Sequence, residues 1–177
     1  MNKAVILDRD GVICEDTHYI TNFNKLHIFS FAAESVHIMH EKGYKVIVVS
    51  NQSAVAREMM NENDVIEINN HIKNETGVDK IYYCPHLPPE SDEREKFPYR
   101  IYCSCRKPEI GMIMQAKKEF NIDLKKSYMV GDRNTDILAG KKAGMQTIYI
   151  KNEQNSRCDI KSNMEFCNIY DFAKQIK

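Results

Sequence analysis

The sequence lacks an excess of charge of either sign, and it lacks a long apolar segment. Lys and Arg together number 25, and Asp and Glu also number 25, so the formal net charge is zero. No whole-molecule field therefore attracts nucleic acid or an acidic membrane surface. No stretch approaches the ~20 consecutive apolar residues of a membrane-spanning helix. We expect a small metabolite as the partner, with no nucleic acid and no membrane.

A secretion signal is also lacking. The first residues lead directly into an apolar run, without the charged region, apolar region and small-residue cleavage site of a signal peptide. We therefore expect a cytoplasmic protein. In that reducing compartment, the six cysteines are expected to be metal ligands or free thiols rather than disulfides.

Two nucleotide-binding motifs are absent as well. No G-x-G-x-x-G follows the first apolar run, and Gly140-Lys141-Lys142 lacks the Ser or Thr and the spacing of a P-loop. This argues against dinucleotide and P-loop enzymes. The length of 177 residues, without internal repeats, fits a single domain over residues 1–177, which we expect to be a monomer.

What the sequence does contain is an alternation of short apolar runs with longer segments of helical periodicity. Continuous apolar, β-branched runs are typical of parallel strands covered on both faces. The expected strands are residues 4–7, 45–49, 80–83, 128–130 and 147–150, and the expected helices carry apolar faces over 33–39, 65–72, 113–120, 137–143 and 170–176. The alternation predicts an α/β fold, a doubly wound parallel sheet with right-handed crossovers.

Polar side chains follow several of these strands directly. Ligands of doubly wound sheets bind beyond the carboxyl ends of the strands, so these residues are considered together. They are Asp8 and Asp10, Ser50 and Asn51, Cys84 and His86, and Asp132. We therefore predict a functional site at this edge of the sheet.

Asp8 and Asp10 have the residue types of a phosphoryl-transfer site. Paired carboxylates after a strand suit Mg²⁺, which takes oxygen ligands and binds substrate phosphate. One carboxylate can act as a nucleophile and the other as general acid and then base. Taken alone, Asp-x-Asp is equally consistent with a charged strand end that faces solvent.

Further along the chain, two segments offer groups that bind phosphate. The hydroxyl of Ser50 and the amide of Asn51 can donate to phosphoryl oxygens, although an ordinary turn also uses such residues. Arg106 and Lys107 precede a helix start, where a cation can neutralise phosphate charge, although a solvated basic pair is the commoner case.

The segment 131–136, GDRNTD, contributes two more carboxylates. Asp132 follows the fourth strand, where a third metal ligand would complete the site. Asp136 lies in the first turn of the next helix, where negative charge is favourable in any case. Asp136 is therefore interpreted either as a cap or as a residue that orients others.

A second metal site is predicted in the loop at about residues 84–105. Cys84-x-His86 is followed after sixteen residues by Cys103-x-Cys105. Three thiols and one imidazole match a structural zinc site. The alternative is a set of free cysteines, but the loop has little apolar content and zinc would supply its order.

Together the motifs resemble the haloacid dehalogenase superfamily, over about residues 4–150. They are DRDGVI (8–13), Ser50, Lys107 and GDRNTD (131–136). The resemblance implies that Asp8 is the phosphorylated nucleophile and Asp10 the general acid and base. It also implies that Ser50 and Lys107 hold the phosphoryl group, and that Asp8, Asp132 and the backbone carbonyl of Asp10 bind Mg²⁺.

Within that superfamily, CPH (84–86) and CSCRKP (103–108) resemble two related families. These are the D-glycero-D-manno-heptose 1,7-bisphosphate phosphatases and the histidinol-phosphate phosphatases. The long zinc loop and the stand-alone length favour the former, which implies hydrolysis of the bisphosphate to the 1-phosphate. The pattern further implies substrate contacts from Asn51, Arg57 and Arg106. A DNA 3′-phosphatase uses the same chemistry but is disfavoured, because the sequence shows no basic stripe interleaved with aromatic residues.

The chain departs from the family pattern at a few positions of the expected substrate rim. The family often has Thr at position 12, where this chain has Val, and usually has Gly at or near His18, Ala54 and Glu58. About forty residues separate Asp10 from Ser50, too few for a helical cap domain, so we predict a capless enzyme. The zinc loop and the loop at 14–29 would then shape specificity.

Overall fold

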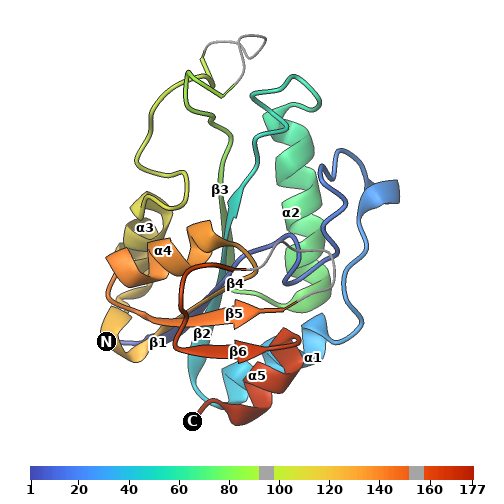
Figure 1. The fold of residues 1–177 in the computed structure, drawn as a ribbon. Helices are drawn as coiled ribbons and strands as arrows, with labels where there is room; N and C mark the ends of the chain where they lie inside the picture. Colours follow the sequence, from blue (N-terminus) through green and yellow to red (C-terminus); the bar gives the residue numbers. More distant parts are fainter. Residues whose placement is uncertain (92–97, 152–157) are drawn as a thin grey trace.

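The computed structural model describes residues 1–91, 98–151 and 158–177 (Figure 1). Six strands form one sheet in the order β3-β2-β1-β4-β5-β6, and every neighbouring pair is parallel. The strands are β1 (Lys3–Leu7), β2 (Tyr44–Asn51), β3 (Lys80–Cys84), β4 (Tyr128–Gly131), β5 (Gln146–Ile150) and β6 (Met164–Phe166). The predicted doubly wound α/β fold is confirmed. The edge strand β6 was not predicted, because its three residues contain no apolar run.

Helices cover both faces of the sheet. The helices are α1 (Ala32–Glu41), α2 (Glu62–Thr76), α3 (Gly111–Phe120), α4 (Asn134–Lys142) and α5 (Ile169–Gln175), with short 3₁₀ helices at η1 (Phe23–Lys25) and η2 (Leu124–Lys126). One hydrophobic cluster joins the sheet to α1, α2 and α5, and the other joins it to α3 and α4. Alternate residues of β1, β2, β3 and β4 face opposite clusters, which explains their apolar runs.

The ends of α2 follow the expected capping residues. Asn61 accepts a hydrogen bond from the backbone of Asp64, whose side chain accepts one from the Asn61 backbone. This reciprocal pair satisfies two amide groups that the first turn would otherwise leave exposed. At the other end, Gly77 has a φ of 77°, a conformation that glycine adopts without strain.

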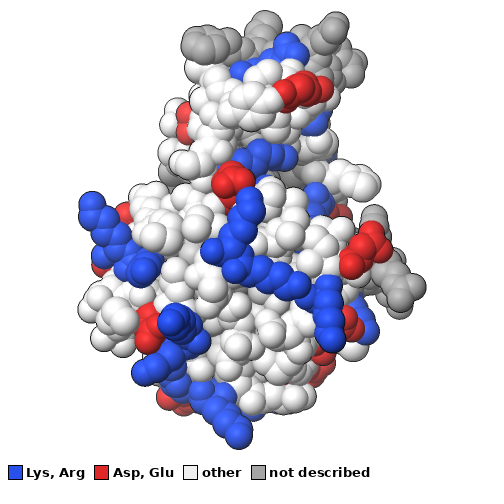
Figure 2. Space-filling view, turned by 60° about the vertical axis from the view of Figure 1, so that its left-hand side comes forward, with Lys and Arg blue, Asp and Glu red and all other residues white. Residues whose placement is uncertain are grey.

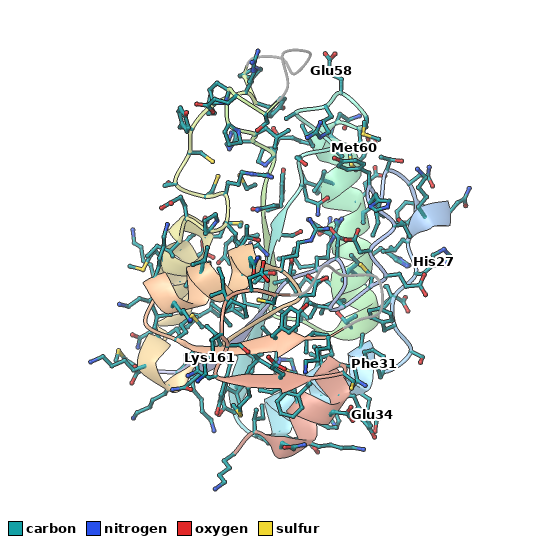
Figure 3. The ribbon with its side chains drawn as sticks, viewed as in Figure 1. His27, Phe31, Glu34, Glu58, Met60 and Lys161 are labelled. Atoms are coloured by element: carbon teal, nitrogen blue, oxygen red, sulfur yellow. The ribbon has the colours of Figure 1, made fainter. Side chains whose placement is uncertain are left out.

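The long loops that follow β2 and β3 lie at the top of the molecule in Figure 1, away from both termini. The chain between β1 and β2 consists of a loop, η1 and α1. Figure 3 shows this loop passing the outer side of α2 at His27 and reaching α1 near Phe31 and Glu34. Within the described ranges no helical cap domain covers the sheet edge, so the fold is capless. Residues 92–97 of the predicted zinc loop lie outside the described residues.

The surface carries charges of both signs. On the face in Figure 2, Lys and Arg side chains lie among Asp and Glu side chains, with uncharged surface between them. Of the helices that the structure describes, none has the length and apolar character needed to cross a membrane.

Candidate active site

A cavity of about 890 Å³ opens at the carboxyl edge of the sheet. Residues at the ends of β1, β2 and β4 meet there with the segment that precedes α3. Of the residues predicted for phosphate, substrate and magnesium, eight line this one cavity: Asp8, Asp10, Ser50, Asn51, Arg57, Arg106, Lys107 and Asp132. Residues up to 124 positions apart in the chain are therefore neighbours at one site.

The floor of the cavity is a buried cluster of charges around Asp8. Lys107 Nζ lies 2.8 Å from Asp8 Oδ1 and 2.6 Å from Asp136 Oδ1. Asp8, Asp132 and Asp136 each offer a carboxylate oxygen, and these oxygens lie within 4.8 Å of one another. The pKa of the Asp8 carboxyl is raised to about 8. Burial and the negative charges of Asp136 and Asp132 raise it, and the positive charge of Lys107 only partly offsets them. Three carboxylates facing one ammonium group fit a divalent cation that prefers oxygen ligands.

Asp136 uses both of its carboxylate oxygens within the protein. Oδ1 pairs with Lys107, and Oδ2 accepts a hydrogen bond of 3.0 Å from the backbone of Arg133 at the start of α4. Gly131 makes this approach possible, because a Cβ atom there would lie 2.2 Å from the Asp136 Cβ. Asp136 therefore caps the helix and orients Lys107 at the same time, which combines the two interpretations that the sequence left open.

Asp10 belongs to a hydrogen-bond network that adjoins this cluster, since the Arg9 backbone N–H donates to Asp8 Oδ1 at 2.7 Å. Arg9 Nε donates to Asp10 Oδ1 at 2.9 Å, and Gln52 Nε2 donates to Asp10 Oδ2 at 2.8 Å. Arg9 is fully buried and also donates to Gln52 and Asn69. Burial raises the pKa of the Asp10 carboxyl, but Arg9 and the hydrogen bond from Gln52 outweigh it and lower that pKa. Sequence reasoning missed Arg9 and Gln52 as site residues, although the position of Arg9 between two acids was a signal.

The end of β2 is connected to Lys107 through Asn51. Asn51 Nδ2 donates to the Lys107 carbonyl at 3.0 Å, and the Lys107 backbone N–H donates to Asn51 Oδ1 at 3.0 Å. Both ends of the amide are thus engaged with the backbone, so Asn51 positions Lys107. Beside it, Ser50 Oγ accepts a hydrogen bond of 2.7 Å from Gln52 Nε2, which links the Ser50 hydroxyl to the Asp10 network.

The rim of the cavity carries two arginines that lie against other loops. The Arg57 guanidinium is 5.8 Å from the centroid of the Tyr19 ring, and Arg106 Nη1 donates to the His86 carbonyl at 2.9 Å. Two of the positions where the chain departs from the family pattern have a positive φ, at 68° for His18 and 55° for Glu58. Figure 3 shows Glu58 at the top of the molecule, with its side chain pointing outward.

The four residues predicted to bind zinc form a compact cluster. One ligand atom from each of Cys84, His86, Cys103 and Cys105 lies within 4.8 Å of the others. The three sulfur atoms are 3.0–3.5 Å apart, yet all three cysteines are free thiols. Burial lowers the pKa of the His86 imidazole, which favours the neutral form that binds metals. Thiols and an imidazole at this spacing are a donor set that fits zinc.

The loop that carries this cluster is attached to the start of α2. The Glu62 carboxylate accepts a hydrogen bond of 2.7 Å from the Tyr83 hydroxyl in β3 and one of 2.8 Å from the Tyr99 hydroxyl in the loop. Sequence reasoning did not find this contact, because the three residues have no shared pattern in the sequence.

Comparisons with known proteins agree with this fold. The HAD-hydrolase-like family model, named for haloacid dehalogenase, matches residues 104–173. The D-glycero-beta-D-manno-heptose-1,7-bisphosphate 7-phosphatase of Haemophilus ducreyi is 38% identical, over 82% of this chain and 80% of its own. The D-glycero-alpha-D-manno-heptose-1,7-bisphosphate 7-phosphatase of Photorhabdus laumondii is 35% identical, over 84% of this chain and 81% of its own. The crystal structure of the D,D-heptose 1.7-bisphosphate phosphatase from B. bronchiseptica, complexed with magnesium and phosphate, superposes with a TM-score of 0.78 at 23% identity, covering 98% of this chain and 97% of that one.

The phosphatase relatives, the family-model match and the strand order together define a haloacid dehalogenase-like phosphatase. Within that class, the chain belongs to the D-glycero-D-manno-heptose-1,7-bisphosphate 7-phosphatase family, since relatives of that name exceed 30% identity over more than two thirds of its length.

Proposed function

We propose that this protein removes the C7 phosphate of D-glycero-D-manno-heptose 1,7-bisphosphate and leaves the 1-phosphate. The observation that carries the proposal is the buried Asp8 carboxylate, 2.8 Å from Lys107 and grouped with Asp132, in a cavity with Arg57 and Arg106 at its rim. An ionised carboxylate beside a cation suits attack on one phosphate, and a divalent cation bound there would favour that ionised form against the raised pKa of the Asp8 carboxyl. Two rim arginines suit a substrate with further negative charge.

In the first step, an Asp8 oxygen attacks phosphorus and the bond from phosphorus to the sugar oxygen breaks. Asp10 donates a proton to that leaving oxygen. In the second step, water attacks the aspartyl phosphate, Asp10 accepts a proton from the water, and phosphate leaves with Asp8 restored. The network around Asp10 favours the ionised form, which is the form that accepts this proton. Its role as an acid requires the protonated form, which the second step of the preceding turnover leaves behind.

Ser50 and Lys107 hold the oxygens of the transferred phosphoryl group, and Asn51 and Asp136 keep Lys107 in place. Phosphoryl transfer depends mostly on alignment and on charge stabilisation, which this arrangement supplies. Mg²⁺, held by Asp8, Asp132 and the backbone carbonyl of Asp10, would neutralise charge on the phosphoryl oxygens. The excess of negative charge around Asp8 supports a divalent cation there.

We further propose that Cys84, His86, Cys103 and Cys105 hold a structural zinc ion. The zinc would order the loop at about 84–105 and thereby place Arg106, since Arg106 follows Cys105 and bonds the His86 carbonyl. The whole chain, residues 1–177, would act as one domain, as a cytoplasmic monomer with a small sugar phosphate as its substrate.

The test is release of phosphate, with Mg²⁺ present, from both anomers of heptose 1,7-bisphosphate, from histidinol phosphate and from a DNA 3′-phosphate. We expect the bisphosphate to be strongly preferred. Preference for histidinol phosphate or for DNA would keep the chemistry and refute the substrate. Some relatives are named for the alpha anomer and others for the beta anomer. The ratio of the activities on the two anomers therefore decides which sugar this protein prefers.

A further inference from the structure

The loop between β1 and α1 holds one residue in a conformation that side chains normally avoid. His18 has a φ of 68°, in the left-handed region. Its backbone N–H donates to Asp16 Oδ1 at 2.9 Å, which closes a tight turn. A residue with a Cβ atom is strained there, and such strain persists where the surrounding structure enforces it, often at binding sites. Glycine would adopt this backbone conformation without strain, so the imidazole at this position needs a reason of its own.

The turn is fastened on both sides of His18. The Asp16 carboxylate pairs with the Arg133 guanidinium, just after β4. On the other side, the Tyr19 ring lies 5.8 Å from the Arg57 guanidinium, which comes from the loop after β2. The position of His18 is therefore set by contacts to both flanks of the cavity.

His18 lies at the mouth of the cavity rather than on its floor. His18 is exposed and lines the cavity, whereas Asp8, which also lines it, is only 6% exposed. Arg57 and Arg106 line the same cavity. A substrate whose reacting phosphate contacts Asp8 would extend its other end toward this rim of donors.

We infer that His18 is a specificity-determining residue that binds the uncleaved phosphate of a sugar bisphosphate, an inference that rests on the proposed function. Either tautomer of imidazole presents one N–H donor, and the protonated form presents two, so a phosphate oxygen is a suitable acceptor. His18 takes no part in the chemistry at Asp8. Its contribution is the same in the bound substrate and in the transition state.

The test compares His18→Gly with the wild-type protein on heptose 1,7-bisphosphate and on the matching heptose 7-phosphate, which lacks the second phosphate. Glycine keeps the turn and removes only the imidazole. Asn121→Gly is the matched control, because Asn121 also has a positive φ, 50°, but ends α3 and does not line the cavity. Both glycine variants should keep the melting temperature or raise it.

For His18→Gly we expect KM for the bisphosphate to rise by about 10- to 100-fold, the range for a lost hydrogen bond to a charged group. The KM for the 7-phosphate and both kcat values should be unchanged, as is typical of uniform binding. Asn121→Gly should match the wild-type protein on both substrates.

Three results would overturn the inference while leaving the proposed function intact. The first is an unchanged KM for the bisphosphate, and the second is an equal rise of KM for both substrates. The third is a fall in kcat with KM unchanged, which would assign His18 to the reacting centre. A wild-type protein that does not cleave the bisphosphate refutes the proposed function itself and this inference with it, before any variant is measured.

Discussion

The carboxylate cluster and the thiol cluster lie at the same end of the molecule, yet they are built in different ways. Asp8 and Asp132 directly follow β1 and β4, and Asp136 lies in the first turn of α4. The thiol cluster instead joins the end of β3 to a loop, attached to α2 through Glu62.

The difference indicates where each site obtains its rigidity. Strand ends are fixed by the hydrogen bonds of the sheet, so the acids are held together in spite of their mutual repulsion. A loop with few apolar residues has no such support and depends on cross-links, which a metal supplies. We therefore expect the carboxylate cluster to govern activity and the thiol cluster to govern the order of the loop.

The largest expected effect comes from Asp8→Asn. Removing the proposed nucleophile should lower kcat by about 10⁴-fold or more, because the neutral amide of asparagine cannot attack phosphorus as a carboxylate does. Phosphate release measures the activity, and circular dichroism with zinc analysis tests the rest of the protein. We expect an intact fold and unchanged zinc content. Substantial residual turnover would show that the nucleophile is another group.

Lys107→Met should have the next largest effect. It leaves the buried carboxylates of Asp8 and Asp136 without their cation, so we expect about 3–5 kcal/mol lower stability in metal-free protein, with partial recovery when Mg²⁺ is added. Urea unfolding with and without Mg²⁺ measures both. The control is Lys142→Met, which breaks the exposed pair with Glu109 and should cost less than about 1 kcal/mol. Equal effects of the two variants would contradict a special role for the buried charge cluster.

Cys105→Ser tests the other site. Loss of one ligand should remove bound zinc, lower stability by about 2–4 kcal/mol and open the loop to proteases. The KM for the bisphosphate should rise because Arg106 adjoins the altered position. The matched control is Cys167→Ser, at an exposed free thiol outside the cluster, which should keep the zinc. A Cys105→Ser protein with full zinc content and an intact loop would reject the zinc site.

The smallest effect is expected at Asp79, a carboxylate with three hydrogen-bond partners. Burial raises its pKa, but hydrogen bonds from Lys45, the Val46 backbone and His40 outweigh burial and lower that pKa below 3.8. A lowered pKa means that the folded state binds fewer protons than the unfolded state. The stabilisation is therefore present above about pH 4 and is lost as pH falls through the folded-state pKa.

Asp79→Asn should accordingly lower the free energy of unfolding by about 1 kcal/mol at neutral pH, and by less in acid. Urea unfolding at about pH 7 and about pH 3 gives the two values. A difference in the free energy of unfolding between variant and wild type that is the same at both pH values would contradict the assigned ionisation of Asp79.

Much of the fold could be predicted from local pattern. The runs at β1, β2 and β4 are apolar without interruption because both faces are covered, and Asn61 and Gly77 mark the ends of α2 by their own backbone preferences. The strand β6 was not predicted, because a three-residue edge strand buries few side chains and therefore shows no apolar pattern in the sequence. The network of Arg9, Gln52 and Asn69 was not predicted because it joins residues far apart in the chain.

What the sequence determined by itself was the chemical inventory: the acids after β1 and β4, the groups at Ser50 and Lys107 that we propose to donate hydrogen bonds to phosphate, and the thiol pairs. Each is a residue type at a strand end or at short spacing, and such features are local. Only the tertiary structure decided how these groups are used. It turned Asn51 toward the Lys107 backbone and placed His18 at the cavity mouth. The orientation of a side chain depends on its neighbours in space, and these come from segments that are distant in the sequence.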